Sequence, residues 1–341
     1  MVAITNICLL TKVRSLNNFN CFLVSFEKYV VSRKKTDSHL AQNNTIRLHY
    51  KYKLALYFNI SYLMSETTMD DAELYNKYHR IQAEEATFVL ENDIKSIKWK
   101  SGDSILDVGT ATGEVTAQVL APLLPHDFEK LVGLDISPEM INLAKEQNKN
   151  PKIDFIVCDI ASENITKTID EKFDHIFSFF CLNWVQNQKQ TVKNMYNLLK
   201  PGGDMLLAIS TKSTIFDIYE SMASYPKWSK FLTNTEEYIS PYNHCTDPET
   251  VYKNMLLDEG FEVKHCRVLQ RFMIFSDLSE LRNTLLAVNP FVNKLPEDLQ
   301  STYVEDYMKE LYNFNYFQRL ESGEIVLKIP HRICTVLAFK P

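Results

Sequence analysis

The stretch Ser104-Ile-Leu-Asp-Val-Gly-Thr-Ala-Thr-Gly113 decides the fold of this chain. It is a short apolar run that ends in an acid, followed by a tight loop bounded by glycines, and the segment 114–123 after it is compatible with a helix. This order of strand, glycine loop and helix is how a doubly wound α/β sheet builds its first nucleotide crevice. Gly109 lets the backbone approach a ligand where a Cβ would collide, and Gly113 lets the helix pack close to the strand. We therefore predict a ligand site at this loop.

Acids at the ends of successive apolar runs indicate which nucleotide binds. Asp107 precedes the glycines, where a carboxylate would repel a pyrophosphate but suits the positively charged amino-acid part of S-adenosylmethionine. Leu131-Val-Gly-Leu-Asp135 is a second such run, at a spacing typical of a carboxylate that accepts hydrogen bonds from ribose hydroxyls. Phe155-Ile-Val-Cys-Asp159 is a third, and its acid suits an adenine amino group. The sequence therefore predicts S-adenosylmethionine as the cofactor.

These three runs, followed by Lys200-Pro-Gly-Gly203, resemble the class I S-adenosylmethionine-dependent methyltransferases, and the resemblance covers most of the chain from about Asp70 onward. Within that class, three further segments resemble the arthropod juvenile hormone acid methyltransferases: Phe177-Ser-Phe-Phe-Cys-Leu-Asn-Trp-Val-Gln186, Ile239-Ser-Pro-Tyr242 and Ala287-Val-Asn-Pro-Phe291. One residue departs from the family's pattern. Ala111 stands in the middle of the glycine loop, where the family usually has a glycine, and we expect its methyl group to weaken cofactor binding.

The resemblance implies a fold and a set of site residues. The expected fold is α/β, a doubly wound, mostly parallel, seven-stranded sheet with a helical, aromatic-rich lid. The expected cofactor-binding residues are Asp107, Gly109, Thr110, Gly113, Asp135, Ile136, Asp159, Ile160 and Ser178. Gln82 and Trp184 are expected to orient the substrate carboxylate, because amide and indole N–H groups donate neutral hydrogen bonds that leave its charge unpaired. No metal site is expected.

Charge divides the chain into two parts. Residues 1–68 hold nine Lys or Arg and three Asp or Glu, whereas the remainder holds 28 and 40. We interpret 1–68 as a poorly ordered extension or an upstream translated stretch, with the functional protein beginning near Met69; a targeting segment is the alternative. Residues 69–341 are expected to form one methyltransferase domain, with a cofactor-binding core at about 95–210, lid and substrate-pocket insertions at about 211–328, and a last strand at 329–341.

Strand and helix patterns alternate after the loop. We predict strands at 130–134, 153–157, 173–179, 205–210 and 262–275, and helices at 70–92, 138–147, 190–199, 248–259 and within 278–312. This alternation implies a mostly parallel sheet with right-handed crossovers, and therefore ligands at the carboxyl ends of its strands. We interpret the aromatic residues beyond Thr211 as a lid, although ordinary core packing must account for at least half of those rings.

Composition excludes several classes of function. A net charge of −6 provides no basic surface for nucleic acid. Seven cysteines without paired spacing indicate neither a disulfide framework nor a zinc site, which suits a cytoplasmic protein. The apolar runs are too short to span a bilayer. We expect a monomer or homodimer whose partner is a small hydrophobic carboxylic acid.

The function that the resemblance implies is methyl transfer to the carboxylate of a long apolar acid such as juvenile hormone acid or farnesoic acid. An acid with a pKa of about 4 to 5 is ionised at neutral pH, so the reaction needs no catalytic base, and His79, His175 and His244 are not assigned as bases. Two alternatives stay open. One is a methyltransferase for another small carboxylate, as in the trans-aconitate methyltransferases, although no arginine lies between Thr211 and Pro248 to pair a polar substrate. The other is a non-catalytic paralogue that binds hydrophobic acids.

Overall fold

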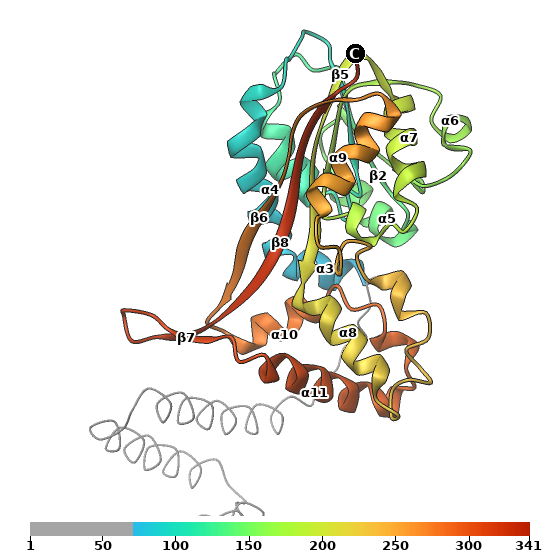
Figure 1. The fold of residues 1–341 in the computed structure, drawn as a ribbon. Helices are drawn as coiled ribbons and strands as arrows, with labels where there is room; N and C mark the ends of the chain where they lie inside the picture. Colours follow the sequence, from blue (N-terminus) through green and yellow to red (C-terminus); the bar gives the residue numbers. More distant parts are fainter. Residues whose placement is uncertain (1–70) are drawn as a thin grey trace, which may run out of the picture. The chain divides into compact units, whose positions relative to one another are not determined.

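The computed structural model describes residues 71–341, so the expectations for 1–68 and for a start near Met69 fall outside the described residues. Within this range the chain forms one twisted sheet with helices on both faces (Figure 1). Helices α8, α10 and α11 gather at one end of the sheet, where they form the lid. The α/β fold with a helical lid that the sequence predicts is therefore confirmed.

The strand order of the sheet is β3-β2-β1-β4-β5-β8-β6. The strands are β1 (Ser104–Val108), β2 (Lys130–Asp135), β3 (Ile153–Val157), β4 (Phe173–Phe179), β5 (Leu199–Ser213), β6 (Glu262–Phe275) and β8 (Ile325–Phe339). The first five strands pair in parallel, and β8 runs antiparallel between β5 and β6. The strand order changes direction between β1 and β4, and a crevice at the carboxyl ends of those strands follows from this topology.

Local sequence signals set many of the helix ends. The helices are α3 (Ala72–Tyr78), α4 (Arg80–Asp93), α5 (Pro138–Gln147), α6 (Ile165–Thr168), α7 (Gln188–Leu198), α8 (Thr214–Ser224), α9 (Pro248–Glu259), α10 (Leu278–Leu286) and α11 (Glu297–Asn313). Ser137 caps α5 by accepting from Met140 N, and Pro138 occupies the first turn. Gly260 ends α9 with a φ of 102°, a left-handed conformation that favours glycine. After Gly113 the chain forms a π-helical turn, Val115–Leu120.

Three boundaries differ from the prediction. The helix expected at 70–92 is broken at His79, whose ring Nδ1 lies 3.0 Å from the Tyr75 carbonyl oxygen that a continuous helix would use. Strand β5 continues to Ser213 because it pairs with β8 as far as His331, and β8 begins at Ile325 because its first residues pair with β6 and β7. A short strand β7 (Phe317–Arg319) pairs with β8 and adds an eighth strand to the seven expected.

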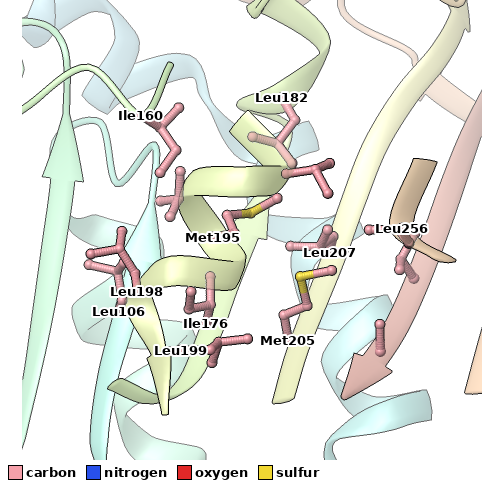
Figure 2. Packing of buried hydrophobic residues seen from close by; sticks show 14 of the residues in the cluster. Leu106, Ile160, Ile176, Leu182, Met195, Leu198, Leu199, Met205, Leu207 and Leu256 are labelled. Carbon is pink, nitrogen blue, oxygen red and sulfur yellow. The ribbon is translucent and has the colours of Figure 1, made fainter. Parts of the chain in front are cut away.

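Helices cover both faces of the sheet, and neighbouring residues of each strand point to opposite faces, so that both sets of side chains are buried. In β1, Leu106 packs toward α7 and α9, whereas Ile105 packs toward α4 and α5. Figure 2 shows the first of these faces, where Met195 and Leu198 of α7 lie beside Leu106. These side chains are almost fully buried. The two apolar layers hold the carboxyl ends of β1, β2 and β4 in one plane.

The lid is held together by its own aromatic side chains. The ring of Tyr219 in α8 meets that of Phe291 edge-on, with 5.2 Å between centroids, and Trp228 meets Tyr303 of α11 in the same way at 5.3 Å. All four rings are buried. The Tyr219 hydroxyl donates to the Val288 carbonyl oxygen at 3.0 Å, which fixes the segment after α10. The aromatic residues of 216–242 thus pack mainly within the lid.

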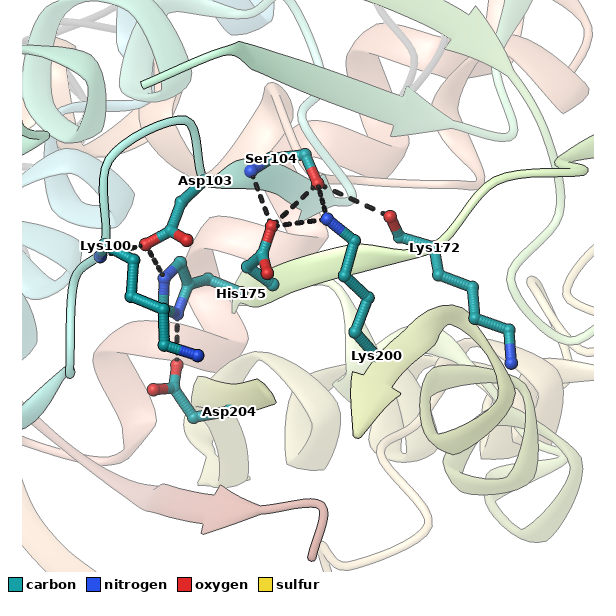
Figure 3. Close-up of polar contacts among 8 residues, drawn as sticks. Lys100, Asp103, Ser104, Lys172, His175, Lys200 and Asp204 are labelled. Carbon is teal, nitrogen blue, oxygen red and sulfur yellow. Dashed lines mark hydrogen bonds and ion pairs between the residues drawn. The ribbon is translucent and has the colours of Figure 1, made fainter. Parts of the chain in front are cut away.

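A buried histidine joins three strands at their amino ends, far along the sheet from the glycine loop (Figure 3). His175 of β4 lies between two buried acids, with Nδ1 2.7 Å from Asp204 Oδ1 and Nε2 2.8 Å from Asp103 Oδ2. Burial alone would lower the pKa of His175, but the hydrogen bonds and charges of Asp204 and then Asp103 raise it above its ordinary value. An imidazolium can donate to both acids at once.

We expect His175→Gln to reduce the free energy of unfolding by about 3 to 5 kcal/mol near pH 6, because two buried acids lose their charged partner. Because the pKa of His175 is raised in the folded protein, its contribution to the free energy of unfolding is complete below the unfolded-state pKa of about 6.5. This contribution is lost as the pH rises through the folded-state pKa. The difference between the native protein and the variant should therefore shrink as the pH rises above about 6.5. Urea unfolding across this range measures it, and a pH-independent difference would contradict the role of the imidazolium.

Candidate functional site

Two glycines of the first loop lie where no side chain fits. A Cβ at Gly109 would lie 2.1 Å from Cβ of Cys181, and a Cβ at Gly113 would lie 2.6 Å from the ring of Phe155. Both glycines have positive φ, 79° and 75°. The backbone N–H of Gly109 donates to the Leu134 carbonyl oxygen at 2.7 Å, which joins the loop to β2. The loop is therefore a closely packed turn whose backbone borders the crevice.

Ala111 adopts the conformation of the glycine that it replaces. Its φ is 47°, in the left-handed region, and its N–H donates to Asp135 Oδ2 at 3.0 Å. The other oxygen of Asp135 accepts from Ser137 N at 2.9 Å. Burial raises the pKa of Asp135, and these backbone hydrogen bonds oppose that rise. The loop geometry thus survives the alanine, at the expense of backbone strain.

A cavity of about 390 Å³ opens at the carboxyl ends of β1, β2, β3 and β4, within the size range of small-molecule sites. Seven residues expected from the sequence line it: Gln82, Gly109, Asp135, Ile136, Asp159, Ile160 and Trp184. Ile136 is 67% exposed, an unusual position for a large apolar side chain beside a cavity. Asp159 Oδ1 accepts from Ala161 N at 2.8 Å, which orders the loop after β3. The structure therefore brings the three strand ends together as predicted.

A smaller compartment of about 20 Å³ adjoins this cavity and shares Tyr75, Gln82, Gly109 and Phe179 with it. Asp107 and Thr110 line the smaller compartment. Asp107 is 3% exposed and accepts from the Thr116 hydroxyl at 2.5 Å. Burial raises its pKa to about 7, against the effect of Thr116 and with a contribution from the charge of Asp135. The acid is therefore poised to change its charge near neutral pH.

Two of the expected residues lie behind the cavity. Gly113 faces the ring of Phe155 and the side chain of Ala144, in the contact between the loop and α5. Ser178 is fully buried, and its hydroxyl donates to the Val108 carbonyl oxygen at 2.8 Å. Neither residue is among those that line the cavity or the smaller compartment. Their observed contacts position β1 and the loop.

Gln82 and Trp184 both line the cavity. The amide oxygen of Gln82 in α4 is buried without a hydrogen-bond partner, which normally costs about 1 to 3 kcal/mol. Trp184 follows β4 in the short turn Leu182–Trp184, and its ring meets Phe216 of α8 edge-on at 5.4 Å between centroids. The orphaned amide of Gln82 is the kind of group that a bound ligand satisfies.

The indole N–H of Trp184 has a partner that the sequence did not indicate. It donates to Asn183 Oδ1 at 3.0 Å, with the Asn183 amide turned so that its NH₂ group donates to the Phe180 carbonyl oxygen at 3.1 Å. The opposite orientation would set two donors face to face and would gain only a 3.4 Å bond from Ser210 N. Asn183 is 2% exposed. The indole is therefore anchored within the protein.

Tyr75, Phe180 and Asn183 are among the residues at the site that sequence reasoning missed. Tyr75 lies seven residues before Gln82, and this spacing would have placed both on one helix face. Phe180 has a φ of 59°, which no propensity indicates for an aromatic residue. The lid contributes Ala287 and Val288 to the cavity, but none of the aromatic residues of 216–242 lines it. Its aromatic lining comes instead from Tyr75, Phe179, Phe180 and Trp184.

The electrostatic character of the site is acidic. Asp135 and Asp159 line the cavity, Asp107 and Glu114 line the smaller compartment, and no lysine or arginine lines either. Within residues 71–341 no group of three or more His, Cys, Asp or Glu side chains is arranged to hold a metal ion. No helix of that part of the chain is long and apolar enough to cross a membrane. A ligand with positive charge near Asp107 and hydroxyl groups near Asp135 fits these features.

The comparisons with known proteins agree with this chemistry. Residues 106–207 match the family model described as "Methyltransferase domain". The juvenile hormone acid O-methyltransferase of Bombyx mori is 33% identical over 276 residues, which cover 80% of this chain and 98% of that protein. The enzyme of the same name from Drosophila melanogaster is 31% identical, over 80% and 93%. A malonyl-[acyl-carrier protein] O-methyltransferase of Ilyobacter polytropus is 32% identical, over 59% and 71%.

The glycine loop, the acid-ended strands and the methyltransferase match define the protein as a class I S-adenosylmethionine-dependent methyltransferase. Its cofactor is S-adenosylmethionine, and the cavity lined by Asp135 and Asp159 at the strand ends has a size suited to such a ligand. Within this class, the chain belongs to the juvenile hormone acid O-methyltransferase family.

The strained loop yields a stability test. We expect Ala111→Gly to raise the free energy of unfolding by up to about 1 kcal/mol, because the left-handed strain removed exceeds the extra entropy of glycine in the unfolded chain. Ala121→Gly is the matched control, since Ala121 has a φ of −56° and should lose about 0.5 to 1 kcal/mol. Thermal unfolding of the three proteins gives the signs, and destabilisation by both changes would show that Ala111 is unstrained.

Proposed function

We propose that this methyltransferase esterifies the carboxylate of a long apolar acid, such as juvenile hormone acid or farnesoic acid. The observation that carries the proposal is the composition of the cavity, which combines neutral donors and apolar walls with no cationic side chain. The names of the two insect relatives support the same acceptor chemistry. A polycarboxylate such as trans-aconitate would bring several negative charges next to Asp135 and Asp159 without a counter-charge, which argues against the first alternative.

The expected cofactor-binding residues that line the cavity or the smaller compartment each have a role in this proposal. Asp135 accepts hydrogen bonds from the ribose hydroxyls with the lone pairs that Ala111 N and Ser137 N leave free. The exposed side chain of Ile136 and the buried Ile160 contact the adenine ring, and Asp159 accepts from its amino group. The backbone of Gly109 and Thr110 borders the amino-acid end, with Asp107 behind it. Bound there, S-adenosylmethionine supplies a methyl group already activated by its positive sulfur.

The remaining task of the protein is to position the acceptor. Gln82 donates its amide N–H to the substrate carboxylate, since rotation of the side chain presents either its oxygen or its nitrogen toward the cavity. Trp184 contributes a second neutral donor by sharing its indole N–H between Asn183 and the carboxylate. Neutral donors hold the oxygen in line without reducing its nucleophilicity, as a lysine or arginine would. The apolar walls exclude water from the carboxylate.

The raised pKa of Asp107 predicts a pH dependence of cofactor binding. Below about pH 7 the acid is increasingly protonated in the free protein, and a positively charged ligand beside it favours the ionised form. Affinity should therefore fall by up to tenfold per unit below pH 7 and level off above it. Calorimetry in buffers of different ionisation enthalpy should detect proton release at pH 6.5. Asp107→Asn should abolish both effects, and an unchanged profile in that variant would remove Asp107 as their source.

We expect Gln82→Leu and Trp184→Phe each to lower kcat/KM for the apolar acid by roughly tenfold to a hundredfold, because a carboxylate oxygen loses its donor in a dry cavity. The affinity for S-adenosylmethionine should be unchanged. The double variant should lose less than the sum, because both donors position one group. Gln186→Leu is the matched control, since Gln186 lines the same cavity but donates to Glu237 O and Ile239 O; it should affect stability rather than acid turnover.

Labelled S-adenosylmethionine with a panel of acids provides the activity measurement. Transfer to farnesoic or juvenile hormone acid and not to trans-aconitate supports the proposal. Cofactor binding without transfer to any acid identifies the non-catalytic alternative. The rate at saturating cofactor should plateau above the pKa of the substrate acid, because no base is required. Near-normal turnover in both Gln82→Leu and Trp184→Phe would exclude these residues from positioning the carboxylate.

A further inference from the structure

The break between α3 and α4 places a histidine beside the smaller compartment. His79 ends α3 and precedes α4, is 6% exposed, and lines the compartment together with Glu114. Its Nδ1 lies 3.0 Å from the Tyr75 carbonyl oxygen, and its Nε2 lies 3.5 Å from Glu114 Oε2. None of the cofactor or substrate roles described above uses this pair.

The hydrogen-bond geometry determines where the protons of His79 lie. A carbonyl oxygen only accepts, so Nδ1 must carry a hydrogen that it donates to Tyr75 O. In a neutral ring Nε2 would then present a lone pair to the Glu114 carboxylate, an unfavourable contact. The ring donates to Glu114 when Nε2 carries a second hydrogen, so that both ring nitrogens act as donors. The compartment therefore sets an imidazole beside a carboxylate.

Glu114 is the carboxylate that is free to reach a ligand. Its side chain is 31% exposed, and 3.5 Å is a loose separation for a charge-assisted hydrogen bond. Asp107, the other acid of the compartment, is nearly fully buried and already accepts from Thr116. The compartment thus offers one carboxylate that can accept hydrogen bonds and, beside it, one imidazole that can donate one when its Nε2 carries a hydrogen. This arrangement complements a ligand group that carries an ammonium and a carboxylate together.

We propose that His79 and Glu114 bind the amino-acid end of the cofactor, with His79 Nε2–H donating to its carboxylate and Glu114 accepting from its ammonium. Each residue exchanges its contact with the other for a contact with the ligand, so both side chains keep a polar partner in both states. The inference rests on the proposed position of the cofactor in this cavity and is independent of the methyl acceptor. It assigns specificity for the intact amino-acid group to two residues outside the glycine loop.

The test uses three probes that differ at this end. S-adenosylmethionine has both groups, decarboxylated S-adenosylmethionine keeps the ammonium and lacks the carboxylate, and 5′-methylthioadenosine has neither group and also lacks the sulfonium charge. Calorimetry on the full chain at about pH 8 should show that the native protein prefers the first probe to the second by roughly tenfold to a hundredfold. Equal affinity for these two probes in the native protein would overturn the role of His79 without any variant.

The variants separate the two residues. His79→Gln should weaken S-adenosylmethionine binding roughly tenfold or more and leave the affinity for decarboxylated S-adenosylmethionine nearly unchanged. Glu114→Gln should weaken both of these probes and leave 5′-methylthioadenosine unaffected. His244→Gln is the matched control, because His244 forms an exposed pair with Glu220 at 2.7 Å in the lid and should change none of the affinities.

Three outcomes would contradict the proposal. A uniform loss with all three probes in His79→Gln would show that the histidine only supports the helix break. An unchanged preference for S-adenosylmethionine over the decarboxylated probe in His79→Gln would assign the carboxylate to another group. Failure of the native protein to bind 5′-methylthioadenosine would show that the cofactor lies elsewhere, and the inference would fall with that position. Transfer to the acid panel tests the acceptor separately, so the two proposals can fail independently.

Discussion

The carboxylate of Asp135 bonds to two backbone N–H groups, and much of the site geometry depends on these bonds. Ala111 N on one side and Ser137 N on the other hold the glycine loop and the start of α5 against the end of β2. Without these hydrogen bonds, no side chain of β2 would hold residue 111 in its left-handed conformation or Gly109 in its close approach to Cys181. One side chain therefore sets both the shape of the loop and the position of a ligand oxygen acceptor.

The sheet and its acid-ended strands could be predicted from the sequence because their signals are local. Asp107, Asp135 and Asp159 each follow an apolar run, and parallel strands necessarily bring such ends to one edge. The caps of α5 and α9 are local as well, since Ser137 and Gly260 determine them within one turn. Residues chosen by these signals, such as Gly109 and Ile136, line the cavity.

The parts that could not be predicted depend on contacts between distant segments. At His79 the helix breaks where the ring Nδ1 takes the Tyr75 carbonyl oxygen, and the other ring nitrogen faces Glu114, which is 35 positions away in the sequence. The partner of the Trp184 indole is its own neighbour Asn183, but the direction of that amide is set by the left-handed turn at Phe180. The aromatic density beyond Thr211 indicates burial but cannot indicate whether a ring faces its own lid or a ligand.

The position of β8 has a consequence for how the protein is made. This strand of 15 residues lies between β5 and β6 and is translated after every other described strand. Until it emerges from the ribosome, β6 has no hydrogen-bonded neighbour in the sheet and the outer edge of β5 is open. Pairing across such sequence separations is slow and leaves strand edges exposed. Before β8 is made, the nascent chain thus carries a nearly complete parallel half-sheet beside unpaired apolar strands. Protection by chaperones matters more in this state than for a fold in which each new strand pairs with the strand made before it.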